Sequence, residues 1–175
     1  GCNGAGKTTT FRMIAGLEPP DSGQIFFRGQ EISRVPMYKR ALMGIGYLPQ
    51  EPSVFAKLTV KENILLVLEN LKMSHLQRQS RLTQLLKEMR LDHLEENKAS
   101  VLSGGERRRL EVTRALATEP AFMMWDEPFA AVDPKVVEYL QELILQLKNK
   151  GIAILVTDHK AEATLGVADY AYIIN

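Results

Sequence analysis

The residues with the clearest chemical meaning stand at the start of the chain, Gly1-Cys-Asn-Gly-Ala-Gly-Lys-Thr8, and fit the pattern G-x-x-x-x-G-K-[ST]. Glycines in such a loop let backbone N–H groups converge on phosphate oxygens, and a helix that begins directly after it points the positive end of its dipole at them. Lys7 is then placed to reach the β- and γ-phosphates of a nucleotide, and the Thr8 hydroxyl to bind Mg²⁺. The spacing predicts a phosphate-binding loop.

Two adjacent carboxylates, Asp126 and Glu127, follow the apolar run 121–125. A carboxylate at the end of a buried strand is suited to hold Mg²⁺ through its coordination shell, which is the role predicted for Asp126. A second carboxylate directly after it suits a general base that polarises an attacking water, so Glu127 is the candidate base. A strand followed by Asp-Glu is a common pattern, and it gains its meaning here from the lysine loop in the same chain.

The elements that must position these groups follow from the spacing of apolar residues. Short apolar runs alternate with helical patterns, which predicts an α/β core with strands over residues 24–28, 45–48, 121–125 and 152–157. The nearly unbroken apolar run 152–157 is typical of a strand covered on both faces. Helices are expected over residues 7–15, where Gly16 ends the pattern, and from Pro134 to Gly151, with Asp133 as N-cap.

Between these core segments the pattern is almost continuous helix, from Thr59 to about Ala117. Thr59-Val-Lys-Glu62 and Ser103-Gly-Gly-Glu106 have the spacing of capping boxes, so each predicts the start of a helix. We therefore expect a single domain, with a core of residues 1–58 and 118–175 and a helical subdomain of residues 59–117.

The composition excludes several classes of protein. Lys and Arg number 22 against 21 Asp and Glu, a formal charge of +1, so no nucleic-acid partner is expected. One cysteine cannot form an internal disulfide, which indicates a reducing compartment. No apolar run approaches the roughly 20 residues of a membrane helix. The chain opens inside the loop motif without a methionine and stops just after an apolar run, so we expect a fragment truncated at both ends.

The segment Leu102-Ser-Gly-Gly-Glu106 distinguishes this chain from other proteins with a phosphate-binding loop. Together with the lysine loop, Gln50, the Asp126-Glu127 pair and His159, it makes five motifs in a fixed order. In these motifs the chain resembles the ATP-binding cassette of ABC transporters over almost its whole length.

The resemblance implies an α/β fold, a P-loop NTPase (RecA-like) core with an inserted ABC helical subdomain, and an ATPase that uses ATP and Mg²⁺. The residues that it implies for nucleotide binding in the loop are Asn3, Gly4, Gly6, Lys7, Thr8 and Thr9. The residues that it implies for Mg²⁺ are Thr8, Gln50 and Asp126. The residues that it implies for hydrolysis are Glu127 as base, Gln50 and His159, with His159 holding the γ-phosphate and the base in register.

Cassettes of this family pair head to tail, so the resemblance also implies a homodimer that shares two ATP sites. Ser103 and Gly105 would donate hydrogen bonds to the γ-phosphate of the other subunit's nucleotide. Asp133 would lie in the loop at the subunit contact. Gln50 would sense integral-membrane transporter subunits, which places the protein at the cytoplasmic face of the inner membrane as a peripheral subunit.

Some stretches are similar to particular groups within the family. Residues 44–50, Phe55 and residues 58–63 resemble both lipopolysaccharide-export and branched-chain amino acid ATPases. Residues 102–109 and 126–129 with 132–134 favour the lipopolysaccharide-export group. The alternatives are the ATPase of a branched-chain amino acid importer, a soluble ABC protein acting on ribosomes or DNA, and a non-catalytic remnant. Residues 51–102 are too few for the long coiled coil of chromosome-type members, and the complete motif set argues against a remnant.

Lys160, directly after His159, departs from the family pattern, and so do three positions in or near the loop and the carboxylates. Cys2 stands where Pro is usual, and Ala131 where Gly is usual. Trp125 replaces a small aliphatic residue directly before the magnesium aspartate, and its bulk is expected to strain the packing of that strand unless its neighbours are smaller. None of the three removes a candidate catalytic group.

Overall fold

The structure is a computed structural model that describes residues 5–130 and 132–172. Its elements fall into two compact units, one made of residues 1–50 and 121–175 and the other of residues 51–120. The first unit holds the sheet and the second is helical. Residues 51–58 and 118–120, which the sequence placed with the core, belong to the helical unit.

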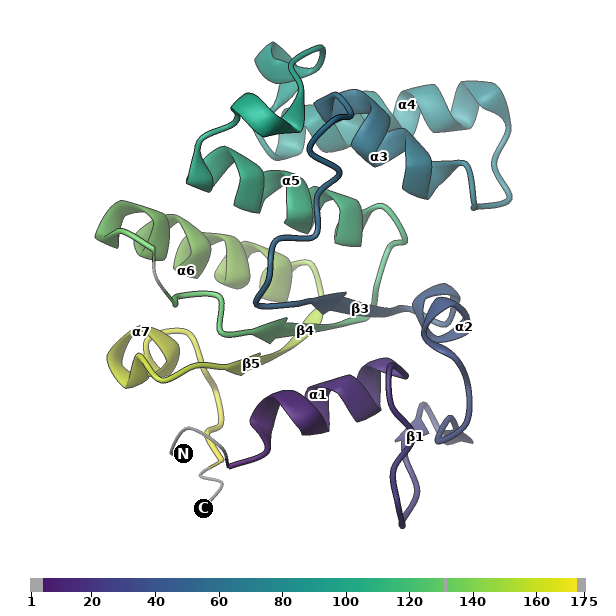
Figure 1. Ribbon diagram of the computed structural model, residues 1–175, viewed down its shortest axis with the longest axis vertical. Helices are drawn as coiled ribbons and strands as arrows, with labels where there is room; N and C mark the ends of the chain where they lie inside the picture. The colour runs from purple at the N-terminus through teal and green to yellow at the C-terminus, as the bar shows by residue number, and fades with distance from the viewer. Residues whose placement is uncertain (1–4, 131, 173–175) are drawn as a thin grey trace. The chain divides into compact units, whose positions relative to one another are not determined.

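The first unit is built on three parallel strands in the order β3 (Ile45–Leu48), β4 (Phe122–Asp126), β5 (Ala153–Thr157). Their register pairs Leu48 with Trp125 and Asp126 with Thr157, so the carboxyl ends of all three strands meet at one edge of the sheet. Helix α1 (Lys7–Ala15) covers one face and α6 (Pro134–Asn149) the other (Figure 1). Polar residues that end these strands are therefore brought together beside the start of α1.

The face under α1 carries a core that the alternation of strand side chains predicts. Phe11 and Ala15 of α1 pack with Ile45 of β3 and Met124 of β4, and Tyr47 and Leu155 join this cluster. Because strand side chains alternate between faces, Asp126 lies on the same face as Met124. The opposite face is covered by the apolar stripe of α6, formed by Leu140, Leu143, Ile144 and Leu147.

Helix α1 ends where the sequence predicted, and the reason is visible in the backbone. Gly16 adopts φ +83°, a left-handed conformation that favours glycine. The chain then forms a short antiparallel hairpin, β1 (Phe26–Phe27) with β2 (Gln30–Glu31), followed by α2 (Met37–Leu42). The expected strand over 24–28 is wrong in extent, because Arg28 and Gly29 turn the chain with φ values of 49° and 78°.

Strand β5 differs from its sequence expectation as well. Ala153 is exposed and the three residues after it are only partly buried, so its two faces are not both covered within the described chain. The cause is its position, since β5 pairs with β4 alone among the described strands and therefore forms an edge. Helix α7 (Ala161–Leu165) follows it.

The helical unit contains α3 (Val60–Leu68), α4 (His75–Glu88), the 3₁₀ turns η1 (Asp92–Leu94) and η2 (Ala99–Val101), and α5 (Gly104–Leu116). Each α-helix of this unit begins with a complete capping box, at Thr59, Ser74 and Ser103. Two of these boxes were predicted from their spacing and are confirmed. In each box the N-cap side chain and the residue three positions later satisfy each other's backbone N–H groups.

Segment 51–58 belongs to the helical unit because helix side chains hold its backbone. The Asn63 side chain accepts from the Phe55 N–H at 2.9 Å and donates to the Phe55 carbonyl at 3.0 Å. On α5, Glu111 accepts from the Ser53 N–H at 3.0 Å, and Arg114 donates to the Ser53 carbonyl. Side chains of α3 and α5 thus provide hydrogen-bond partners for the backbone of a segment that has no regular secondary structure.

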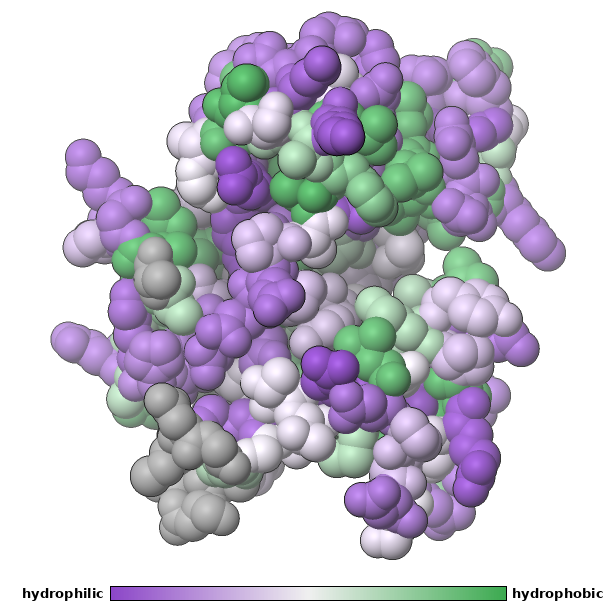
Figure 2. All heavy atoms as spheres, viewed as in Figure 1, coloured by the Kyte–Doolittle hydropathy of each residue, from purple (hydrophilic) through white to green (hydrophobic). Residues whose placement is uncertain are grey.

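Hydrophobic side chains reach the surface of both units (Figure 2). In the helical unit the exposed large apolar residues are Phe55, Leu66, Leu76 and Val101. None of the described helices combines the length and the apolar character needed to cross a bilayer.

Candidate functional site

The predicted phosphate loop leads directly into α1. Gly6 is the N-cap residue and adopts φ +83°, and its carbonyl accepts from both the backbone N–H and the hydroxyl of Thr10 at 2.9 Å. The N–H groups of the first turn have no partners within the helix, so they point at the space before it. Asn3, Gly4 and Cys2 lie outside the described residues.

A cavity of about 360 Å³ opens at this point. Its described lining consists of Ala5, Gly6, Lys7, Thr8, Thr9, Gln50 and Glu127. Lys7 and Thr8 come from the first turn of α1, whereas Gln50 follows β3 and Glu127 follows β4. The structure therefore brings together candidate residues that are more than 100 positions apart in the chain.

Asp126 ends β4 as a nearly inaccessible carboxylate, with 1% of its surface exposed. Three hydroxyl groups surround it. Thr157 donates to Oδ1 at 2.6 Å and Thr8 to the same oxygen at 3.4 Å, while Tyr47 donates to Oδ2 at 3.4 Å. Burial, followed by the neighbouring carboxylate, raises the pKa of Tyr47 to about 12, so this phenol stays a hydrogen-bond donor at neutral pH.

Glu127 lines the cavity and approaches both of the other residues predicted for hydrolysis, Gln50 and His159. The Gln50 side chain donates from Nε2 to Glu127 Oε2 at 3.0 Å. His159 places Nδ1 at 3.7 Å from the same oxygen, and its side chain is half exposed. The three residues that the sequence assigned to hydrolysis thus form one cluster after β3, β4 and β5.

Ser103, Gly105 and Asp133 are not in the described lining of this cavity. Ser103 is the N-cap of α5, in the helical unit, and Gly105 lies in the first turn of that helix. The Ser103 hydroxyl donates to Glu106 at 2.7 Å, and this bond and one from the Ser103 backbone lower the pKa of Glu106. Asp133 is the N-cap of α6 and accepts from the Val136 N–H at 3.1 Å.

Two residues beside Asp126 were not singled out from the sequence, Tyr47 and Thr157. Thr157 is the register partner of Asp126 on the neighbouring strand, so its side chain lies on the same face. The signal that could have found both residues is the alignment of the strand ends, because Tyr47 and Thr157 are each followed within three residues by a predicted site residue.

Trp125, for which the sequence predicted strain unless its neighbours are smaller, lies in an unbroken strand. It is fully buried, and the parallel register continues through it, pairing it with Leu48 on one side and Val156 on the other. Within residues 5–130 and 132–172 its indole N–H has no hydrogen-bond partner. Ala131, the other departure near this segment, lies outside the described residues.

The residues present fit a Mg²⁺ ion that is held mainly by phosphate oxygens. No three His, Cys, Asp or Glu side chains converge on a metal site in the part of the chain that the structure describes. A carboxylate and a hydroxyl do converge, Asp126 and Thr8, and these are the hard oxygen ligands that Mg²⁺ takes beside a nucleotide.

The ABC transporter family model matches residues 1–130, which is the part that carries the loop, Gln50, Ser103 and the two carboxylates. The chain belongs to the ABC transporter family. This cassette is 52% identical over 175 residues to the lipopolysaccharide export system ATP-binding protein LptB of Acidithiobacillus ferridurans, covering all of this chain and 73% of that protein. It is 49% identical to LptB of Haemophilus influenzae, over 99% of this chain and 73% of the relative.

Solved structures of ABC cassettes have the same fold. The cbiO1 cassette of Clostridium perfringens superposes with a TM-score of 0.84 at 28% identity, over 95% of this chain and 68% of that one. A chain of the dimeric structure of the ATP-binding cassette MJ0796 bound to ADP and phosphate superposes with a TM-score of 0.80 at 26% identity, over 95% of this chain and 75% of that one. The predicted P-loop NTPase core with an inserted helical region is confirmed.

Proposed function

We propose that this cassette hydrolyses ATP as one half of a homodimer and powers the export of lipopolysaccharide from the inner membrane. The observation that carries the hydrolytic part is the shared cavity. Lys7 and Thr8 line the same space as Glu127, and Gln50 holds the Glu127 carboxylate at 3.0 Å. A cation for phosphates and an oriented carboxylate at one cavity suit a triphosphate whose terminal group is attacked by water.

Nucleotide binding is assigned to the loop and the first turn of α1. Gly6, Lys7, Thr8 and Thr9 all line the cavity, and the helix start adds the N–H groups of its first turn and the positive end of the dipole. The assignment extends to Asn3 and Gly4. Beside the Lys7 and Thr8 side chains, backbone N–H groups of the loop supply further donors for the phosphate oxygens.

Mg²⁺ would be held by Thr8, Asp126 and Gln50. When bound, the ion neutralises charge that develops on the phosphates during transfer. The chain's own contribution is to fix the carboxylate before the ion arrives, since Thr157 and Tyr47 hold one oxygen each of Asp126. Such outer contacts orient a ligand and reduce the cost of ordering it.

In the proposed hydrolysis, Glu127 accepts a hydrogen bond from the attacking water and polarises it. Gln50 and His159 both approach Oε2 of this carboxylate, so we assign Oε1 to the water. His159, with Nδ1 turned toward Glu127, has Nε2 to contact the γ-phosphate. The arrangement supports a water-activating role for Glu127 with two neighbours that fix its rotamer.

The dimer is proposed because cassettes of this family pair head to tail, with the residues that correspond to Ser103 and Gly105 facing the nucleotide of the other copy. Ser103 and Gly105 stand at the start of α5, where the first turn and the positive end of the helix dipole suit a phosphate of the partner's nucleotide. Asp133, at the start of α6, would lie at the subunit contact. The dimeric form of the related cassette MJ0796 supports this arrangement.

The cargo is proposed from the relatives. The relatives that are 52% and 49% identical to this chain are ATP-binding proteins of lipopolysaccharide export systems. Export of that lipid requires integral-membrane subunits, so we propose that the cassette binds such subunits as a peripheral protein at the cytoplasmic face of the inner membrane. Residues 102–109 and 126–129 with 132–134 carry the sequence similarity that favours this group.

Replacing the candidate base tests the proposal. In the full-length protein, Glu127→Gln keeps the shape of the side chain and its contact with Gln50 but cannot take up a proton. Steady-state phosphate release should fall by at least about 100-fold, the usual contribution of a general base. Binding of a fluorescent ATP analogue should remain close to that of the wild type, because the groups assigned to the phosphates are unchanged.

The same pair of proteins tests the cargo. In cells of Escherichia coli depleted of their own LptB, a relative 46% identical to this chain, the wild-type protein should restore lipopolysaccharide at the cell surface and Glu127→Gln should not. Retained turnover in Glu127→Gln would remove Glu127 as the base. If the protein hydrolyses ATP but does not restore surface lipopolysaccharide, the proposed ATPase activity is supported and the proposed cargo is wrong.

A further inference from the structure

Glu127 has an unusual backbone for a residue with a side chain. Its φ is +46°, in the left-handed region, which is sterically unfavourable for a residue other than glycine. Such strain persists at a site only where the surrounding structure holds it in place. The turn that starts at Glu127 must therefore be fixed by neighbouring groups.

Three backbone N–H groups in this turn are fixed by acceptors. The Glu127 N–H donates to the Thr157 carbonyl at 2.8 Å, and the Ala130 N–H donates to the Glu127 carbonyl at 3.2 Å. Pro128 has no N–H, so the next donor is that of Phe129. It donates to Oδ2 of Asp158 at 2.8 Å, and this is the one contact of the three made by a side chain.

The second oxygen of Asp158 holds the other loop of the site. Oδ1 accepts from the Lys160 N–H at 2.8 Å, directly after His159. The Asp158 side chain is completely buried, and its Oδ1 lies 3.8 Å from Nδ1 of His159. One carboxylate thus ties the segment after Glu127 to the segment that carries His159, although the two are about 30 residues apart.

The charge of this carboxylate suits the task. A carboxylate has acceptor sites on both oxygens, so it can bind two N–H donors at once. An amide of the same shape has one acceptor oxygen and would turn its NH₂ group toward one of the donors. Hydrogen bonds to an ionised acceptor are also about twice as strong as those between neutral groups.

We propose that Asp158 is a positioning residue for hydrolysis: it holds the strained turn at Glu127 and the His159 loop in one fixed relation. The proposal rests on the function proposed above, because it assigns the same two side chains to catalysis. It predicts that Asp158 governs the rate of the chemical step and leaves nucleotide binding alone, since Lys7 and Thr8 are held by α1.

The test is Asp158→Asn in the full-length protein, with kcat and KM measured for ATP. We expect kcat to fall roughly 10- to 100-fold, the size of effect that follows from a small misplacement of catalytic groups, and KM to stay near the wild-type value. Asp169→Asn is the matched control, because it makes the same change in charge at an exposed residue paired with Lys148. It should hydrolyse ATP at the wild-type rate.

A second variant, Asp158→Ser, has one shorter hydrogen-bond acceptor in place of the carboxylate. It allows the same measurement of kcat and KM if Asp158→Asn does not fold. A folded Asp158→Asn protein with wild-type kcat would overturn the proposal, as would variants in which ATP affinity and melting temperature fall as far as kcat does. If Glu127→Gln also retained wild-type turnover, the proposed function itself would have failed. If Glu127→Gln is inactive while Asp158→Asn is fully active, the Asp158 proposal fails alone.

Discussion

The carboxylate of Asp126 shows how much of this site is made by residues that touch no substrate. It is buried, and burial of an ionised carboxylate is costly unless hydrogen bonds replace the lost water. The shortest of those bonds comes from the Thr157 hydroxyl at 2.6 Å. The position of a proposed magnesium ligand therefore depends on a threonine of the neighbouring strand.

Removing that hydroxyl should weaken metal binding. In Thr157→Val the side chain keeps its shape, but Oδ1 of Asp126 loses its closest donor. We expect the affinity for Mn²⁺, measured by electron paramagnetic resonance in the presence of ATP, to fall about 10-fold or more, as for other outer contacts of metal ligands. Thr157→Ser keeps the hydroxyl and should bind Mn²⁺ like the wild type. Equal Mn²⁺ affinity in Val and Ser variants would show that the hydroxyl does not position the carboxylate.

The types of the site residues could be predicted from the sequence, but their contacts could not. Lys7, Gln50, Glu127 and His159 were assigned from motif order, and the structure brings them to one cavity or one cluster. The bond from Tyr47 to Asp126 depends on the pairing of strands separated by more than 70 residues, which no local pattern encodes. Asp158 was visible in the sequence only as the residue beside His159.

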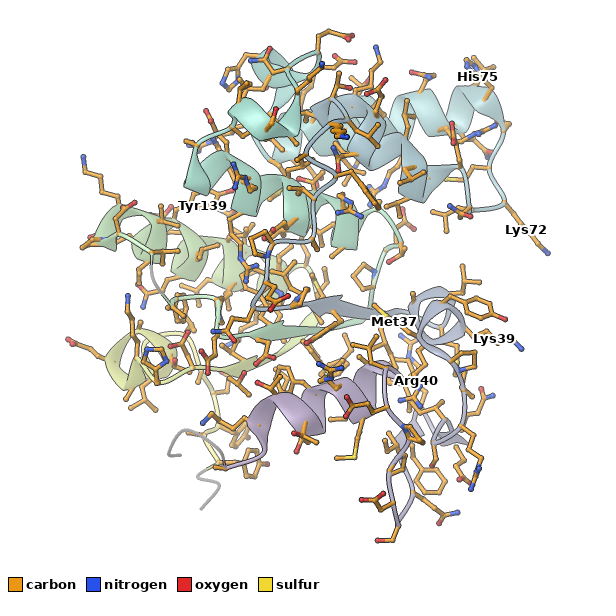
Figure 3. All side chains as sticks on the ribbon, viewed as in Figure 1. Met37, Lys39, Arg40, Lys72, His75 and Tyr139 are labelled. Carbon is orange, nitrogen blue, oxygen red and sulfur yellow. The ribbon has the colours of Figure 1, made fainter. Side chains whose placement is uncertain are left out.

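At the scale of elements, the junction between α1 and α2 is organised by one buried arginine. Arg40 of α2 is 1% exposed and donates hydrogen bonds to the backbone carbonyls of Met13, Ile14, Ser33 and Val35 (Figure 3). Burial lowers its pKa. A cation at this place also faces the negative end of the α1 dipole, so it stabilises the helix that carries Lys7 and Thr8.

This junction explains why residue 16 must be glycine. A Cβ at Gly16 would lie 2.8 Å from Nε of Arg40 and 2.9 Å from the Val35 carbonyl oxygen, and the φ of +83° already disfavours any side chain. Gly23 has the same φ, but a Cβ there would have no neighbour within 4 Å, so Gly23→Ala isolates the backbone cost.

Gly23→Ala should lower the free energy of unfolding by about 1–2 kcal/mol, the cost of an alanine with a left-handed backbone conformation. Gly16→Ala should add about 1–3 kcal/mol for overpacking against Arg40. Thermal or urea unfolding followed by circular dichroism compares the two variants directly. Equal losses in both would mean that Arg40 moves away at no cost and does not hold the junction.

Elements with local signals were predicted well and those without were not. The boxes at Thr59 and Ser103 and the N-cap at Asp133 are present because each is made by residues three positions apart. The sequence predicted one longer strand where the structure has the hairpin β1–β2. At its turn Arg28 adopts a left-handed backbone conformation, which no sequence pattern predicts for arginine. The exposure of β5 depends on which strands flank it, and that is a property of the whole sheet.

At the scale of the molecule, the sequence indicated a core interrupted by helices, and the structure divides the chain after residue 50 and after residue 120. The expected limits, 59 and 117, followed the helix signals. The difference arises from segment 51–58, which has no regular structure and is held by Asn63, Glu111 and Arg114. Contacts between side chains and irregular backbone produce no hydrophobic periodicity, so the sequence does not predict them.

In the proposed dimer, the start of α5 must contact the nucleotide that is bound by a partner copy. Glu127→Gln with Mg²⁺ and ATP should therefore form a dimer by size-exclusion chromatography with light scattering, and the wild type with ADP should not. Ser103→Asp in the Glu127→Gln background separates capping from phosphate binding. Aspartate caps a helix as well as serine does, so α5 should stay intact, while its negative charge opposes the phosphate.

We expect the double variant to remain a monomer with an unchanged melting temperature. The result follows from electrostatics, since a carboxylate at the cap turns the favourable end of the α5 dipole into a repulsive site for a triphosphate. A dimer that forms as readily when Ser103 is replaced by aspartate would show that α5 does not contact the shared nucleotide. Each cavity would then have to bind its triphosphate with the lining that one copy supplies, and the pairing of two cassettes would need another cause.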